Sequence, residues 1–160
     1  MNAFRYVGKM MHCRNPFPLP DRLDAEFRPV VTFWKNLKRG ENGMPFGDDL
    51  ELSALSKLAG NPFLLTVSPP PERYRLEFTC DNLRTEAVTG SFIDEMPSNV
   101  NFGYLRAQSS ATVEAAEPTL LRLTQFSGYS FSRVLMPLWG NGQVNMLLGA
   151  IDRWAVVARP

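Results

Sequence analysis

The stretch from Phe131 to Ile151 constrains the fold most, because two apolar runs meet there across Gly140, Asn141 and Gly142. Glycine and asparagine adopt positive φ angles at low cost, so this triplet is typical of a tight reversal between antiparallel strands. Residues after the turn alternate with a period of two, and those before it are apolar on both sides. The pattern predicts a hairpin at the centre of a sheet, covered on both faces or nearly so.

Three further strands are predicted from short apolar or alternating runs at 63–67, 73–80 and 120–126. The second of them has the clearest alternation, with arginines, a glutamate and a threonine on one face. The opposite face is expected to point into the core and carries Tyr74, Leu76, Phe78 and Cys80.

Helical spacing predicts an amphipathic helix over 24–39, with Asp24 capping its start and Gly40 ending it. Short helices are expected within 50–58 and 81–88. A longer helix, capped by Ser98 or Asn99, is expected before Pro118, with Tyr104, Ala107 and Ala111 at near-helical spacing.

The chain has 160 residues, of which 44% are hydrophobic and 21% charged, so one globular domain is expected. We place this single domain at 24–160. It follows an N-terminal arm, 1–23, in which alternating Pro16, Pro18 and Pro20 prevent a helix. The front half of the arm is apolar and is expected to lie on the domain or on a partner.

Charge and hydropathy limit the binding partners and the cellular location that we expect for this protein. Lys and Arg number 17 against 16 Asp and Glu, so the formal net charge of +1 disfavours nucleic acid and anionic membranes. No apolar run approaches the roughly 20 residues that cross a bilayer, and 1–13 lacks the apolar core of a signal peptide. We expect a soluble, cytoplasmic protein in which Cys13 and Cys80 are free thiols.

Several short segments are similar in order and spacing to a known family. They are Phe33-Trp34-Lys35-Asn36-Leu37-Lys38 with Met44-Pro45, Arg73-Tyr74-Arg75-Leu76, Val88-Thr89-Gly90, Leu135-Met136-Pro137-Leu138 and Met146-Leu147-Leu148-Gly149-Ala150. From Phe27 to Asp152 the chain resembles a small bacterial PAS-like family found mostly in alphaproteobacteria. It departs from that family at Phe78, where a small residue is usual.

The resemblance implies an α+β, PAS-like fold. A five-stranded antiparallel sheet would have helices inserted between strands 2 and 3 and an amphipathic helix before it. It also implies a non-catalytic sensory or regulatory domain that binds a small molecule or a protein partner for signal transduction. The alternative is a homodimerising interaction module with a closed core and no ligand, in which helix 24–39 and the arm cover the sheet of another protomer.

The sequence gives little support for a catalytic or cofactor-binding motif. The single histidine, His12, lies in the arm, which argues against an axial haem ligand and against a Ser-His-acid triad. The run from Met10 to Cys13 contains soft metal ligands, but neighbours in an extended chain point in opposite directions. Acidic pairs and the strand arginines Arg73 and Arg75 are interpreted as surface charges. We expect a protein that is not an enzyme and binds no metal ion, and the sequence identifies no cofactor.

A PAS-like pocket would lie between the sheet and the inserted helices, where a mostly apolar cavity is the usual form of a small-molecule site. The same residues would also serve in a simple filled core. The candidates for this pocket are Tyr74, Phe78, Cys80, Tyr104, Phe126, Trp139 and Met146.

Overall fold

The structure, a computed structural model, describes residues 15–83, 89–96, 102–124 and 129–155. Its strands are β1 (Pro62–Val67), β2 (Tyr74–Thr79), β3 (Thr119–Thr124), β4 (Tyr129–Gly140) and β5 (Gln143–Ala155). Its helices are α2 (Arg28–Leu37), α3 (Leu52–Leu55) and α4 (Leu105–Ala115), with 3-10 turns η1 (Ala25–Phe27), η2 (Gly47–Asp49) and η3 (Asp81–Leu83).

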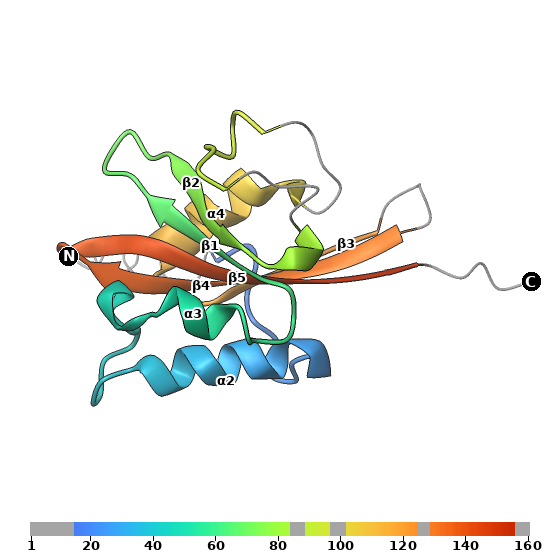
Figure 1. The fold of residues 1–160 in the computed structure, drawn as a ribbon, viewed down its shortest axis with the longest axis horizontal. Coiled ribbons are helices and arrows are strands. Elements are labelled where there is room, and N and C mark those ends of the chain that lie inside the picture. The colour runs from blue at the N-terminus through green and yellow to red at the C-terminus, as the bar shows by residue number, and fades with distance from the viewer. Residues whose placement is uncertain (1–14, 84–88, 97–101, 125–128, 156–160) are drawn as a thin grey trace, which may run out of the picture.

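The strands form one antiparallel sheet in the order β2-β1-β5-β4-β3 (Figure 1). The first hairpin, β1–β2, lies beside the last, because β1 pairs with β5. Helix α4 falls between β2 and β3 in the chain, and α2 precedes the sheet. The expected α+β class with a five-stranded antiparallel sheet is therefore confirmed.

The predicted central hairpin is confirmed as β4 and β5. Gly140 is opposite Gln143, and the two residues between them, Asn141 and Gly142, have φ angles of 54° and 78°. Two positive φ angles match the twist of a tight two-residue reversal, which is why this triplet marks the turn. Val134 to Leu138 are fully buried, because both faces of β4 are covered.

Each face of the sheet carries its own core (Figure 1). On one face α2 and α3 pack over the strands, and on the other lies α4. We call these the α2-side core, which includes Phe27, Val30, Trp34, Leu64 and Met136, and the α4-side core, which includes Phe63, Leu65, Leu76, Leu105 and Phe131. The indole Nε1 of Trp34 donates to the carbonyl of Pro137 at 2.9 Å, which fixes α2 on the sheet of its own chain.

The alternation predicted for β2 holds from Tyr74 to Leu76 and then breaks. Leu64 of β1 is opposite Phe78, whereas the next residue, Leu65, is opposite Leu76, so β2 carries one extra residue there. A bulge of this kind moves the following side chain to the other face. Phe78 packs on the α2-side core, away from Tyr74 and Leu76, so the prediction of one shared face is wrong for Phe78.

The first helix starts where it was predicted, because Asp24 is the N-cap residue of η1 and η1 runs directly into α2, but the predicted cap bond and the predicted end are wrong. The Asp24 side chain makes no cap hydrogen bond; its carboxylate oxygens accept from Arg122 Nη2 at 3.0 and 2.9 Å. The carboxylate thus forms an ion pair with Arg122 of β3 instead of a cap bond with its own helix. Helix α2 ends at Leu37, before Gly40, because Lys38 is already extended.

The face predicted for the long helix is also wrong. Helix α4 begins at Leu105, after Tyr104 in a left-handed conformation with a φ angle of 58°. Tyr104 is 66% exposed and Ala107 is exposed. The buried face consists instead of Leu105, Gln108, Ser109 and Thr112. Three of these four are polar, so apolar periodicity favoured the wrong side. The predicted caps Ser98 and Asn99 lie outside the described residues.

The described part of the arm lies on the domain. Phe17 and Leu19 pack at the margins of the two cores, and the amide of Leu120 in β3 donates to the carbonyl of Phe17 at 3.0 Å. The predictions for 1–14, including the metal ligands around His12, lie outside the described residues, as do those for 84–88.

Candidate functional site

The seven predicted pocket residues do not gather at one place. Tyr74 is buried in the α4-side core, Met146 packs at the margin of the α2-side core, and Tyr104 and Trp139 are 66% and 36% exposed. Phe126 lies outside the described residues. Phe78 and Cys80 are half-buried and do lie together, in an open groove beyond the end of β2.

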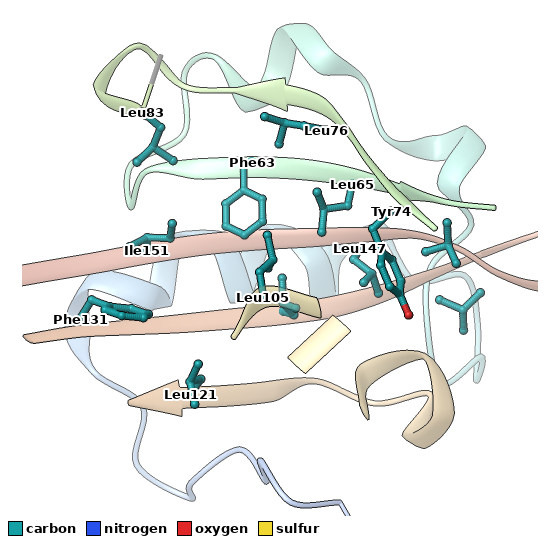
Figure 2. Close-up of a cluster of buried hydrophobic side chains, with 13 residues drawn as sticks. Phe63, Leu65, Tyr74, Leu76, Leu83, Leu105, Leu121, Phe131, Leu147 and Ile151 are labelled. Carbon is teal, nitrogen blue, oxygen red and sulfur yellow. The ribbon is translucent and has the colours of Figure 1, made fainter. Parts of the chain in front are cut away.

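The space between α4 and the sheet is filled by side chains where the structure describes it. Figure 2 shows Phe63, Leu65 and Leu147 from the central strands in one cluster with Leu105 of α4 and Leu121 of β3. Phe63 has no exposed surface, and its ring meets the ring of Phe102 edge-on, with centroids 5.7 Å apart. The described residues therefore form a closed core at the position where a pocket was expected.

The groove lies between the α3–β1 connection and the β2–η3 connection, with a volume of about 440 Å³. Its walls combine apolar surface from Leu58, Pro62 and Phe78 with the polar side chains of Asn61 and Asn82. Asn82 Nδ2 donates to Asn61 Oδ1 at 2.8 Å, and Asn61 Nδ2 donates to the carbonyl of Ile151 at 3.1 Å. These bonds fix one wall of the groove to the central strand β5.

Cys80 lines this groove and also packs at the margin of the α4-side core. Burial raises the pKa of its thiol above the usual value, with only partial compensation from backbone amides. A thiol with a raised pKa holds little thiolate at neutral pH, so Cys80 is a poor nucleophile. It is a free thiol that lines the groove.

A second polar feature lies between α4 and the strands β3 and β4. Arg133 of β4 has no exposed surface; its Nε donates to Gln108 Oε1 at 2.8 Å and its Nη2 donates to the carbonyl of Gly103 at 2.9 Å. Gln108 Nε2 in turn donates to the carbonyl of Arg133 at 2.9 Å and to Thr119 Oγ1 at 3.2 Å. We call Arg133, Gln108, Thr112 and Thr119 the α4 network.

Burial lowers the pKa of Arg133 to about 9, so the guanidinium stays charged at neutral pH. An ion taken out of water is costly unless its donors are satisfied, and here the acceptors come from α4 and from the residue pair just before it. The network extends to the hydroxyls of Thr112 and Thr119, which are 2.7 Å apart. Helix α4 is thus held on the sheet largely by directional hydrogen bonds.

Sequence reasoning missed the α4 network. Arg133 is the only charged residue of β4 and directly precedes the apolar run Val134 to Leu138, and this lone charge was the signal available. Its acceptor Gln108 lies 25 residues away, and only the tertiary structure brings the two together.

The remaining charged candidates are surface pairs. Arg73 bonds to Asp94 and Glu95, Arg75 bonds to Glu77, and Arg39 bonds to Asp49, all with exposed arginine side chains.

No group of His, Cys, Asp or Glu side chains in the described ranges is arranged to hold a metal ion. Within the same ranges no helix is long and apolar enough to span a bilayer.

No protein-family model matches this chain, and no match is found among curated proteins or solved structures.

Proposed function

We propose that this chain is a non-catalytic regulatory domain of PAS-like type that binds a small molecule in the groove lined by Phe78 and Cys80. The observation that carries the proposal is the groove itself. Its volume of about 440 Å³ lies in the usual range for small-molecule sites, and it joins an aromatic wall to two fixed amides. The helical segment between β2 and β3, which the PAS resemblance implies, supports the assignment of the fold type.

The proposed signal passes from the groove to α4 through the α4-side core. Cys80 contacts that core from the groove, and Leu105, the first residue of α4, is buried in the same core. The α4 network is joined to the same helix, because Arg133 bonds to Gln108 of α4 and to the carbonyl of Gly103 just before it, so a shift of α4 would alter these bonds. A ligand that displaces Cys80 would thereby change the position of α4.

A thermal-shift screen with a mixture of soluble metabolites, followed by single compounds, tests the proposed function. The groove is blocked from outside by Ser56→Trp, because Ser56 is exposed and lines it. The matched control is Ser53→Trp, which changes an exposed serine on α3 that does not line the groove. We expect a compound that raises the Tm of the wild type and of Ser53→Trp but not of Ser56→Trp.

Amide hydrogen exchange with the same compound tests the second step. We expect slower exchange in η3 and a change in α4. A compound that stabilises Ser56→Trp as strongly as the wild type would show that the groove is not the site.

A further inference from the structure

The two edge strands of the sheet, β2 and β3, differ in how far other backbone segments cover their outer edges. The outer edge of β2 is occupied by 90–93: the amide of Leu76 donates to the carbonyl of Ser91 at 2.9 Å, and the amide of Ile93 donates to the carbonyl of Tyr74 at 2.9 Å. Such coverage is the usual protection of an edge against association.

The outer edge of β3 is covered only at its start. Leu120 donates its amide outward to Phe17, and Pro18 forms an isolated bridge with Thr119. Alternate residues of a strand present their amide and carbonyl groups to the same side, so Arg122 and Thr124 also present theirs outward. Within the described residues neither has a backbone partner on that side, and both are exposed.

We propose that this edge pairs antiparallel with the same edge of a second copy of the chain. A two-fold axis through Leu123 places Arg122 of each copy opposite Thr124 of the other. Each of the two Arg122–Thr124 pairs then exchanges two backbone hydrogen bonds, four in all, and the two sheets become one continuous sheet of ten strands.

A second copy suits this edge for two reasons. First, the edge is self-complementary: Leu123, half-buried at the margin of the α4-side core, meets its own equivalent at the axis, so apolar surface meets apolar surface. Second, each Arg122 is already bonded to Asp24 of its own chain, so the two arginines come together without uncompensated positive charge. This dimer does not depend on a ligand in the groove.

Sedimentation equilibrium across a range of concentrations tests the proposal, with Thr124→Pro and Thr124→Val as a matched pair. Both variants lose the hydroxyl that accepts from Ser130, but only proline removes the outward amide. The inward ladder to β4 is kept in both. We expect the wild type and Thr124→Val to dimerise, and Thr124→Pro to weaken dimerisation about tenfold or more, since each copy loses one donated bond.

Hydrogen exchange gives a second measurement that does not depend on the variants. We expect the amides of Arg122 and Thr124 to be protected at high protein concentration and to exchange fast on dilution. A wild type that stays monomeric, a Thr124→Pro variant that dimerises like the wild type, or protection that is independent of concentration would each overturn the proposal.

Discussion

Arg133 of β4 has no exposed surface, and two of its bonds reach Gln108 in the first turn of α4 and Gly103 just before the helix. Burying an ion costs several kcal/mol, and removal of one acceptor leaves the charge uncompensated. Apolar residues of similar volume can replace such a group at little net cost when the pair is replaced together. Arg133 and Gln108 should therefore behave as a coupled pair.

Replacing Gln108 by Leu should lower the free energy of unfolding by about 3 kcal/mol or more, because the Arg133 Nε loses its acceptor. The double variant Gln108→Leu with Arg133→Met should recover part of this loss. Urea unfolding of the wild type, both single variants and the double variant gives the coupling energy, which we expect to exceed about 1 kcal/mol. Simple additivity of the two losses would contradict the coupling.

Asp152 of β5 is opposite Ser132, and its carboxyl lies within electrostatic reach of Glu26 of η1. Burial, followed by the charges of Glu26 and Asp24, raises its carboxyl pKa in the folded state. A raised pKa means that the folded state binds the proton more tightly than the unfolded chain. The favourable contribution is therefore complete below the unfolded pKa of about 4 and is lost as pH rises through the folded pKa.

Asp152→Asn should therefore stabilise the protein at pH 7, by about 0.5 kcal/mol or less because solvent screens the partly exposed carboxylate. The gain should vanish near pH 3, where the Asp152 carboxyl is protonated in both the folded and the unfolded chain. Urea midpoints measured from pH 3 to pH 7 check this, with the exposed Asp48→Asn as control. A gain that does not change with pH would exclude the electrostatic cause.

At the scale of elements, the register between β1 and β5 is fixed by a close contact of a ring with a glycine. Phe63 is opposite Gly149, and a Cβ added there would lie 2.5 Å from Phe63 Cε1 and nearer still to Cζ. The ring cannot move away easily, because it is fully buried against Phe102. A one-residue slip of β1 would bring a side chain of β5 into the ring.

Gly149→Ala should lower the free energy of unfolding by about 3 kcal/mol, at the upper end of the usual cost of overpacking. The same change in a Phe63→Leu background should cost less, since the smaller side chain leaves room. Thermal unfolding of the two single variants and the double variant checks this. Gly43→Ala is the control, because a Cβ at Gly43 would meet nothing within 4 Å. An equal cost in both backgrounds would show that the ring is not the obstacle.

At the scale of the whole molecule, the sheet is covered on both faces by its own chain. The α2-side core is closed by Trp34 and its neighbours, and the α4-side core is closed by α4 and 90–105 where described. The alternative in which helix 24–39 covers another protomer would require α2 to leave its own sheet and break the bond from Trp34 to Pro137. Association through the β3 edge needs no such rearrangement.

The sequence by itself determined the strands, the central hairpin and the amphipathic helix α2. Each depends on neighbours in the chain: positive φ angles at Asn141 and Gly142, alternation up to Leu76, and apolar spacing from Phe27 to Trp34. These local preferences persist in the folded state because the core satisfies them.

Only the tertiary structure decided where polar side chains found their partners. The Asp24 carboxylate accepts from Arg122, 98 residues away, instead of capping its own helix. Helix α4 buries its polar face because Gln108 on that face bonds to Arg133 and Thr119 of the sheet. The bulge that moves Phe78 across the sheet is likewise set by pairing with β1. Hydrogen bonds between distant residues leave no periodic pattern in a sequence, whereas burial of apolar side chains does.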